Sequence, residues 1–168
     1  MKTPGEFFLV ISPSQTIMDY VSYLKREIKK IVGHNYPSAF AKAHISLFKY
    51  PDHHTESFLY QVDSEVSRQK AFHVHVRDLG VFKHGANGTI YLNIEHKSPI
   101  CDLVELWTRK TINPHITIAR NLEPNDFIKA REIVKDISYE NDFICDRITV
   151  LKKTRGYWYS YLELPFHK

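Results

Sequence analysis

Two short segments of this sequence carry the residue types that acid–base chemistry requires. They are AHISLFK at residues 43–49 and PHITIAR at residues 114–120. In each, a histidine (His44 or His115) precedes an isoleucine, a hydroxyl residue (Ser46 or Thr117) and a further apolar residue, and a basic side chain stands five positions after the histidine. One such pattern is weak evidence in a chain with 10 histidines, whereas two with matching flanks favour a shared role.

The spacing within each segment is typical of a strand with one buried face. Successive side chains of a strand point to opposite faces, so His44 shares a face with Ser46, and His115 shares one with Thr117. The apolar residues between them would then pack into a core. Imidazole and hydroxyl lie about 7 Å apart along such a strand, at a rise of roughly 3.3 Å per residue. Two of these strands side by side would frame a pocket with two imidazoles and two hydroxyls.

Phosphodiester chemistry needs this set of groups. A neutral imidazole can take the proton of the nucleophile, while a protonated one gives a proton to the leaving oxygen. Histidine suits both roles because its unperturbed pKa is about 6.5. The hydroxyls and imidazole N–H groups can stabilise charge on the non-bridging oxygens. The arrangement requires no metal and no cofactor, and it leaves open which histidine is the acid.

The basic residues that follow the motifs, Lys49 and Arg120, are candidate substrate-binding residues with one objection. A guanidinium can hold a phosphate bidentately. However, position 120 has the opposite parity to position 115, so Arg120 reaches the histidine face only if the strand ends or bulges near Ala119. The same objection applies to Lys49. The alternative is a solvated charge at the end of a strand.

Strands and helices alternate around the motifs. Apolar spacings of three and four, with Ser14 as N-cap and Gly33 as the end, predict the first helix. Turns at 84–88 and at Arg155-Gly156 predict two hairpins. We expect strands at 7–12, 43–50, 72–82, 88–95, 115–120, 143–153 and 157–164, and helices at 14–32, 56–70, 99–109 and 124–138. This order predicts an α+β fold, and the recurrence of strand, helix and motif strand predicts two related antiparallel lobes in a single domain, residues 1–168.

Composition and charge are those of an ordinary globular protein. Of the 168 residues, 43% are hydrophobic and 25% charged. A net charge of +4 suits an anionic ligand. The apolar run at residues 7–11 is too short for a signal peptide or a membrane span. Cys101 and Cys145 stand in no metal-binding spacing, although a disulfide between them stays open. A reduced, cytoplasmic protein with no membrane partner is expected.

The paired motifs resemble those of the 2H phosphoesterase superfamily, which includes the LigT-like 2′-5′ RNA ligases and cyclic nucleotide phosphodiesterases. The family signature is a pair of H-x-[S/T] motifs, and here His44-Ile45-Ser46 and His115-Ile116-Thr117 stand 71 residues apart. Residues 7–11 are similar to the family's first strand, and residues 79–82 with 89–92 to its mid-chain hairpin. One departure is Ser46, where the family more often has threonine; serine keeps the hydroxyl but loses the methyl that stiffens χ1.

The resemblance implies a fold and an activity. The fold is a bilobal α+β protein with two pseudo-symmetric antiparallel β-sheet lobes and outer helices around a central cleft. The activity is 2′,3′-cyclic phosphate opening, or related phosphodiester cleavage, on a nucleotide or an RNA end, with the histidines as general acid and base. Arg120 matches a family arginine that helps to bind the substrate phosphate.

Aromatic residues are candidates to stack on a base. Phe82, Tyr157 and Tyr159 could do so, because unstacked bases commonly lie on aromatic side chains. The alternative for each is the core or a cross-strand pair. Trp158 alternates with its tyrosine neighbours and should face the other way.

Two further histidine pairs raise the question of a metal site. They are His73 with His75, and His53 with His54. Neither pair has a third ligand at a recognisable spacing, so no metal is expected.

Two alternatives to a hydrolase stay open. The first is a module that binds a nucleotide or RNA without turnover, although a pure binder has no need of two proton-transfer groups. The second is a 2′-5′ RNA ligase, which runs the related transesterification in reverse in the same site. The chain lacks an obvious long basic stripe for extended RNA, which favours a small substrate or an RNA end. We expect a monomer.

Overall fold

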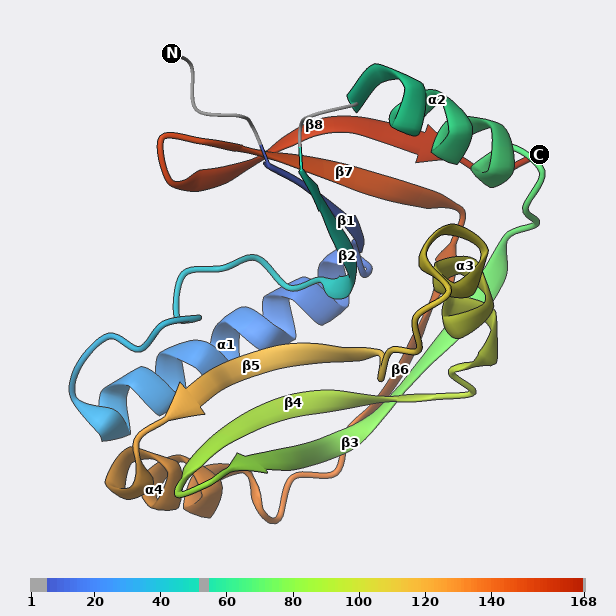
Figure 1. The fold of residues 1–168 in the computed structure, drawn as a ribbon. Helices are drawn as coiled ribbons and strands as arrows, with labels where there is room; N and C mark the ends of the chain where they lie inside the picture. The colour runs from blue at the N-terminus through green and yellow to red at the C-terminus, as the bar shows by residue number, and fades with distance from the viewer. Residues whose placement is uncertain (1–5, 52–54, 168) are drawn as a thin grey trace.

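The computed structural model describes residues 6–51 and 55–167, so the pair His53 and His54 lies outside the described residues (Figure 1). The strands are β1 (Glu6–Ile11), β2 (Ile45–Pro51), β3 (Phe72–His84), β4 (Asn87–Glu95), β5 (His115–Leu122), β6 (Glu140–Cys145), β7 (Arg147–Thr154) and β8 (Tyr157–Pro165). The helices are α1 (Gln15–Val32), α2 (Thr55–Val66), α3 (Ser98–Thr108) and α4 (Pro124–Val134).

All these strands form one curled antiparallel sheet, in the order β6-β3-β4-β5-β2-β1-β7-β8 (Figure 1). The predicted α+β class is confirmed. The two lobes, however, are halves of one continuous sheet, which meet where β2 pairs with β5 through Ile45 and Ile116. Each half therefore contributes one motif strand to this central seam.

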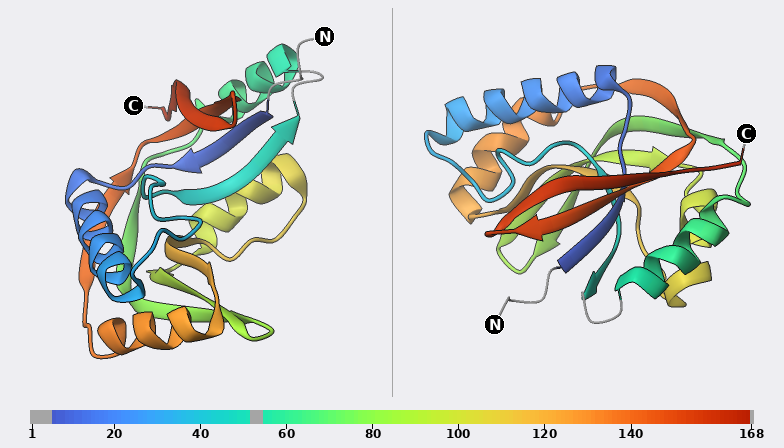
Figure 2. Two further views of the ribbon diagram at one scale, coloured as in Figure 1. Left: turned by 90° about the vertical axis from the view of Figure 1, so that its left-hand side faces the viewer. Right: turned by 90° about the horizontal axis from the view of Figure 1, so that it is seen from above.

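The helices pack on the halves of the sheet in two pairs. α1 and α4 contact each other and lie over β4 and β5, whereas α3 contacts β2 and α2 contacts β8. Figure 2 shows these pairs at opposite sides of the molecule. Phe48 of β2 packs against Phe58 of α2 and Trp107 of α3, with ring centroids 5.7 and 5.6 Å away. Among the described helices, none combines the length and the apolar character that crossing a membrane would take.

Helix α1 follows its predicted pattern except at its ends. Gly33 ends the helix in the left-handed region, at φ +84°, and its N–H donates to the Lys29 carbonyl. Ser14 occupies the N-cap position, but its hydroxyl makes no capping hydrogen bond. Ile31 follows Ile28 at a spacing of three but is 49% exposed, because Val32 packs into the core in its place. The face that lies on the sheet carries Ile17, Val21, Leu24 and Ile28.

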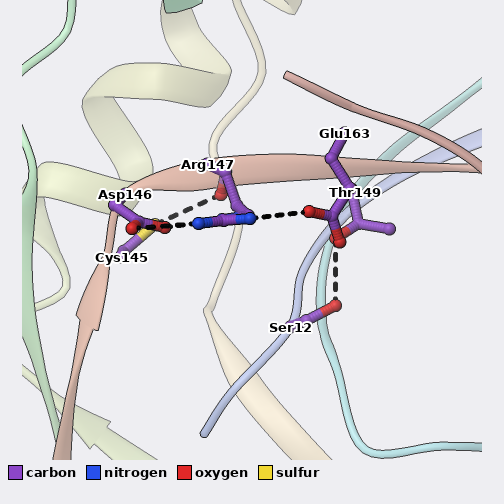
Figure 3. Close-up of polar contacts among 6 residues, drawn as sticks. All are labelled: Ser12, Cys145, Asp146, Arg147, Thr149 and Glu163. Atoms are coloured by element: carbon purple, nitrogen blue, oxygen red, sulfur yellow. Dashed lines mark hydrogen bonds and ion pairs between the residues drawn. The ribbon is translucent and has the colours of Figure 1, made fainter. Parts of the chain in front are cut away.

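Residues 143–153 form two strands, not the single predicted one. β6 pairs with β3 at one end of the sheet, and β7 pairs with β1 and β8 at the other. The chain crosses between them at Asp146. There the Arg147 guanidinium donates to Asp146 at 2.8 Å and to Glu163 of β8 at 2.9 Å (Figure 3). The hydrogen bond from Arg147 also holds the pKa of the Asp146 carboxyl below its usual value. Alternation of apolar residues could not reveal the break, because it carries no information about partner strands.

Candidate active site

The two motifs lie next to each other at the seam of the sheet. Ile45 pairs with Ile116. Continuing this antiparallel register by one residue in each direction places His44 opposite Thr117 and Ser46 opposite His115. Both histidines are half-buried, and both isoleucines are fully buried on the other side of the sheet. We call the face with the polar residues the motif face; it is defined by His44, Ser46, His115 and Thr117.

Each motif strand carries a bulge at the third residue after its histidine. In β2 the register with β1 skips Leu47, and in β5 the register with β4 skips Ile118. A bulge inserts one residue and so reverses the alternation beyond it. Lys49 is therefore paired with Phe8 on the motif face. Arg120 is exposed next to buried Ala119, and its charge lowers the pKa of His115. The parity objection to both basic residues is thus removed.

Both imidazoles are fixed by the same backbone device. Nδ1 of His44 donates to the Lys42 carbonyl at 2.8 Å, and Nδ1 of His115 donates to the Asn113 carbonyl at 2.7 Å. A carbonyl only accepts, so the proton of each neutral ring stays on Nδ1. Nε2 is left as the reactive nitrogen of both rings, as a base when bare and as an acid when protonated.

Around His44 the motif face combines aromatic rings with cations. The Phe8 ring meets the imidazole edge-on, with centroids 5.4 Å apart, and it also contacts Trp158 of β8 at 5.4 Å. Nζ of Lys49 lies 5.4 Å from the centroids of both aromatic rings. Nζ of Lys153 lies 5.6 Å from the Trp158 ring. The cation–π contacts leave the Lys49 ammonium free to meet an anion, whereas that of Lys153 also pairs with Glu6 at 3.1 Å.

Around His115 the wall is aromatic. Phe82 and Tyr91 stack on each other with centroids 4.2 Å apart, and each contacts the imidazole edge-on at 5.2 Å. The stack depends on Gly80, which pairs with Tyr91: a Cβ there would lie 2.5 Å from the tyrosine ring. Phe82 was predicted at the site from the sequence, and the structure brings it into contact with His115; its role in binding a substrate remains a prediction.

A buried lysine braces the segment that leads into the first motif. Lys25 of α1 is only 6% exposed, and its Nζ donates to the carbonyls of Ser38 and Ala41, both at 2.7 Å. The Ser38 hydroxyl in turn accepts from the backbone N–H of Arg120 at 2.9 Å. It also approaches the carbonyl of Ile118 at 3.5 Å. The segment that contains Ser38 and precedes His44 is thus connected to the bulge of β5.

Burial and positive neighbours lower the pKa of both motif histidines. For His44 desolvation is the main cause; the Lys42 hydrogen bond opposes it, and the charges of Lys25, His115 and Lys49 add to it. For His115 desolvation again leads, opposed by the Asn113 hydrogen bond and reinforced by Lys97 and Arg120. Burial also lowers the pKa of Lys25 to about 8. The charge of His115 acts on His44, as the pairing of their strands through Ile45 and Ile116 leads one to expect.

Tyr157 is a predicted site residue that the structure does not bring to the motifs. It pairs with Thr154 and is 69% exposed, on the face of β8 opposite to Trp158. Tyr159 shares that outer face. The alternation of these residues was foreseen, but which of them faces the histidines depends on the neighbouring strands. Trp158 therefore takes the position that Tyr157 was expected to fill.

Further residues at the site escaped sequence reasoning. Tyr91 and Phe8 lie in apolar strands where nothing separates them from core residues. Lys25 did leave a signal: it stands four residues after Val21 and three before Ile28, on the apolar face of its helix. A lysine at such a position is normally excluded from a core unless it is hydrogen-bonded.

Residues able to hold a metal do not gather at the motifs. His73 and His75 are exposed on β3, with rings 6.0 Å apart, and Nδ1 of His73 lies 3.5 Å from a carboxylate oxygen of Asp142. In the described ranges, 6–51 and 55–167, no group of three or more potential metal ligands is found.

A family model decides which known proteins this arrangement belongs with. The model of the 2′-5′ RNA ligase superfamily matches residues 22–156, which include both motifs. The chain belongs to the 2′-5′ RNA ligase superfamily, the LigT-like 2H phosphoesterases. The resemblance seen in the paired motifs is thus confirmed. The set of curated proteins contains no match.

Solved structures show the same fold over the whole chain. Escherichia coli LigT in its apo form superposes with a TM-score of 0.69 at 13% identity, covering 99% of this chain and 100% of that one. LigT complexed with 3′-AMP gives 0.68 at 14% identity, with 98% and 99% covered. The Thermus thermophilus protein TT0787 gives 0.67 at 13% identity, with 95% and 97% covered. At these identities the likeness establishes the LigT-like fold, and residue roles must be argued from this chain.

Proposed function

We propose that this chain is a metal-independent phosphodiesterase that acts on nucleotides or RNA ends. It would open 2′,3′-cyclic phosphates or cleave related phosphodiesters, with His44 and His115 as general acid and base. The observation that carries the proposal is the matched fixing of both imidazoles. Each ring has its Nδ1 on a backbone carbonyl, which leaves both Nε2 atoms for proton transfer beside a pair of hydroxyls.

The reaction needs one neutral and one protonated ring. The neutral imidazole takes a proton from water as the water oxygen attacks phosphorus. The bond from phosphorus to the 2′ or 3′ oxygen breaks, and the other ring, as imidazolium, gives that oxygen its proton. A phosphomonoester results, and the two rings have exchanged protonation states. This exchange is reversed by proton transfer with water before the next turnover.

The surrounding residues can hold the phosphate while its charge develops. Ser46 and Thr117 supply hydroxyl donors on the motif face, and Arg120 and Lys49 supply positive charge after their bulges. An anionic substrate also raises the pKa of a nearby histidine. Binding would therefore supply the imidazolium that the depressed pKa values disfavour in the free protein.

The aromatic walls suit a nucleotide. The Phe82–Tyr91 stack beside His115 and the Trp158 ring, which packs on Phe8 beside His44, offer flat surfaces for a base. LigT structures have been obtained with ATP, NADP⁺ and 3′-AMP. These complexes support a nucleotide as the ligand class of the present site.

The test is turnover by single variants on defined substrates. His44→Ala and His115→Ala would be assayed on 2′,3′-cyclic nucleotides and on a panel of oligonucleotide and cyclic phosphodiesters, with His73→Ala as a matched surface control. We expect both motif variants to lose activity and the control to retain it. Undiminished turnover in either motif variant would overturn the mechanism. Tight nucleotide binding by the wild type with no product on any substrate would favour a binding module.

RNA ligation is a second candidate, because the matching family model is that of the 2′-5′ RNA ligases. The same acid and base serve transesterification in both directions. Incubation with an RNA bearing a 2′,3′-cyclic end and one bearing a 5′-hydroxyl would distinguish the directions by the appearance of a 2′-5′ linked product.

A further inference from the structure

The β7–β8 hairpin presents a second aromatic surface that the proposed reaction does not use. Tyr157, Tyr159 and Tyr161 of β8 are 69%, 57% and 51% exposed. Large aromatic side chains that are exposed as a group, rather than singly, commonly mark a binding surface. Together with two cations of β7 and its turn, they make what we call the outer hairpin face; it is defined by Lys152, Arg155, Tyr157, Tyr159 and Tyr161.

The outer hairpin face is opposite to the motif face. Trp158 pairs with Lys153, whereas Tyr159 pairs with Lys152. The two lysines confirm the separation, because Nζ of Lys153 lies over the Trp158 ring and Nζ of Lys152 lies 5.3 Å from the centroid of Tyr161. The register of β8 with β7 skips Tyr161, and the contact of its ring with Lys152, the partner of Tyr159, places both tyrosines on the same side.

This end of the sheet is hollowed and lacks a covering helix. The helix that packs against β8 is α2, which lies toward the C-terminal end of β8 and away from the turn (Figures 1 and 2). A hollow of about 390 Å³ opens on the outer face and is lined by Lys152, Thr154, Arg155, Tyr159, Ser160 and Tyr161. Tyr161 leans edge-on against buried Phe7, at 5.5 Å, so the wall of the hollow is anchored to the core.

The charges of this surface favour a polyanion. Arg147 and Lys153 of the same hairpin form ion pairs with Glu163 and Glu6, respectively. For Lys152 and Arg155, by contrast, no carboxylate partner is found in the described part of the chain. A second copy of this protein would bring the same two cations against each other, whereas a phosphate backbone would neutralise them.

We propose that the outer hairpin face binds single-stranded nucleic acid, at a distance from the reacting phosphate. Alternate residues of a strand are about 6.6 Å apart, so Tyr157 and Tyr159 form successive platforms for bases, with Lys152 and Arg155 along the backbone. Because β8 is the edge strand of the sheet, a chain whose end lies at His44 and His115 can pass around it without crossing a neighbour. The inference rests on the proposed function and names its substrate class: an RNA end with several nucleotides attached.

The experiment compares a short and a long substrate with one variant. Wild type and Tyr159→Ala would be assayed on a 2′,3′-cyclic mononucleotide and on a single-stranded RNA of about ten nucleotides with the same cyclic end. Loss of one stacking contact should raise KM for the long substrate roughly tenfold and leave the mononucleotide unchanged. Tyr60→Ala, an exposed tyrosine on α2 (76%), is the matched control and should change neither. Lys152→Gln should weaken binding of the long substrate. It should also reduce the slope of log KM against log salt concentration by about one.

The outcomes separate this inference from the proposed function. An unchanged KM of Tyr159→Ala on the long RNA overturns the inference, as does an equal change on both substrates. If the wild type turns over neither substrate, the proposed function fails, and fluorescence anisotropy with the same RNA then decides the inference alone. Binding weakened by Tyr159→Ala but not by Tyr60→Ala supports it. A dimer in sedimentation that Tyr159→Ala dissociates would assign the surface to a second copy and overturn it.

Discussion

The two motif histidines have the same backbone setting and different surroundings. Each donates from Nδ1 to the carbonyl two residues before it, and each is followed by a bulge after three residues. Beyond that the sides diverge: His44 has one aromatic edge and several cations, whereas His115 stands against the stacked pair of Phe82 and Tyr91. The proton-transfer geometry is thus duplicated, and the walls that receive a substrate are not.

This difference leads to an assignment of roles. Three positive neighbours (Lys25, His115 and Lys49) act on His44, in addition to its burial. We predict that His44 acts as the base and His115 as the acid; burial and nearby cations lower the pKa of both rings, so the pH profiles of the single variants decide the assignment.

The largest effect concerns the limbs of the pH profile. Loss of either histidine should reduce kcat by about 10²–10⁴-fold, the range of general acid–base catalysis. The pKa of both rings lies below its usual value, so the wild-type kcat/KM should rise as the pH passes the pKa of the base and fall again as it passes the pKa of the acid. His44→Ala should lose this acidic limb, and His115→Ala should lose the alkaline limb. The measurement is kcat/KM from about pH 4 to about pH 10, a range that brackets the pKa of histidine. Exchanged limbs would reverse the assignment, and two intact limbs in both variants would contradict the mechanism.

A smaller effect is expected from the cations after the bulges. Arg120→Ala should raise KM by roughly 10–100-fold, because a hydrogen bond to a charged group contributes about 1.5–3 kcal/mol. Lys49→Ala should raise it less, since an ammonium lacks the bidentate geometry. Arg120→Lys should recover part of the loss, and Arg68→Ala on the turn after α2 serves as a control of equal charge. Equal increases in KM for Arg120→Ala and Lys49→Ala would show that the His115 side and the His44 side contribute equally to phosphate binding.

The smallest effect is a loss of stability on the His115 side. Ser38→Ala leaves the N–H of Arg120 without its acceptor, which should cost about 1–3 kcal/mol of the free energy of unfolding. Urea denaturation measures it, and Ser67→Ala, an exposed serine whose hydroxyl donates to the Ser64 carbonyl of its own turn, should change little. Stability equal to that of the control would show that the loop around Ser38 does not brace the β5 bulge.

Local pattern predicted most elements and the paired motifs, because apolar spacing and turn residues are local properties. Features that depend on the partner strands could not be predicted from the sequence. The bulges at Leu47 and Ile118 bring Lys49 and Arg120 to the motif face. No residue type in either strand predicts these bulges. The exchange of Tyr157 for Trp158 has the same origin, since alternation identifies two faces of a strand without telling which one meets the histidines.

The crossing of the chain at Asp146 has a consequence for synthesis on the ribosome. The half of the sheet with β3, β4 and β5 receives its last strand when β6 emerges. β1 and β2 are made first, yet β1 has an unpaired edge until β7 follows. Pairing between strands so distant in sequence is slow and exposes an apolar edge meanwhile. A nascent chain that ends just after β6 therefore already contains both histidine motifs, but the β1–β2 pair becomes an internal part of the sheet only after β7 has been made.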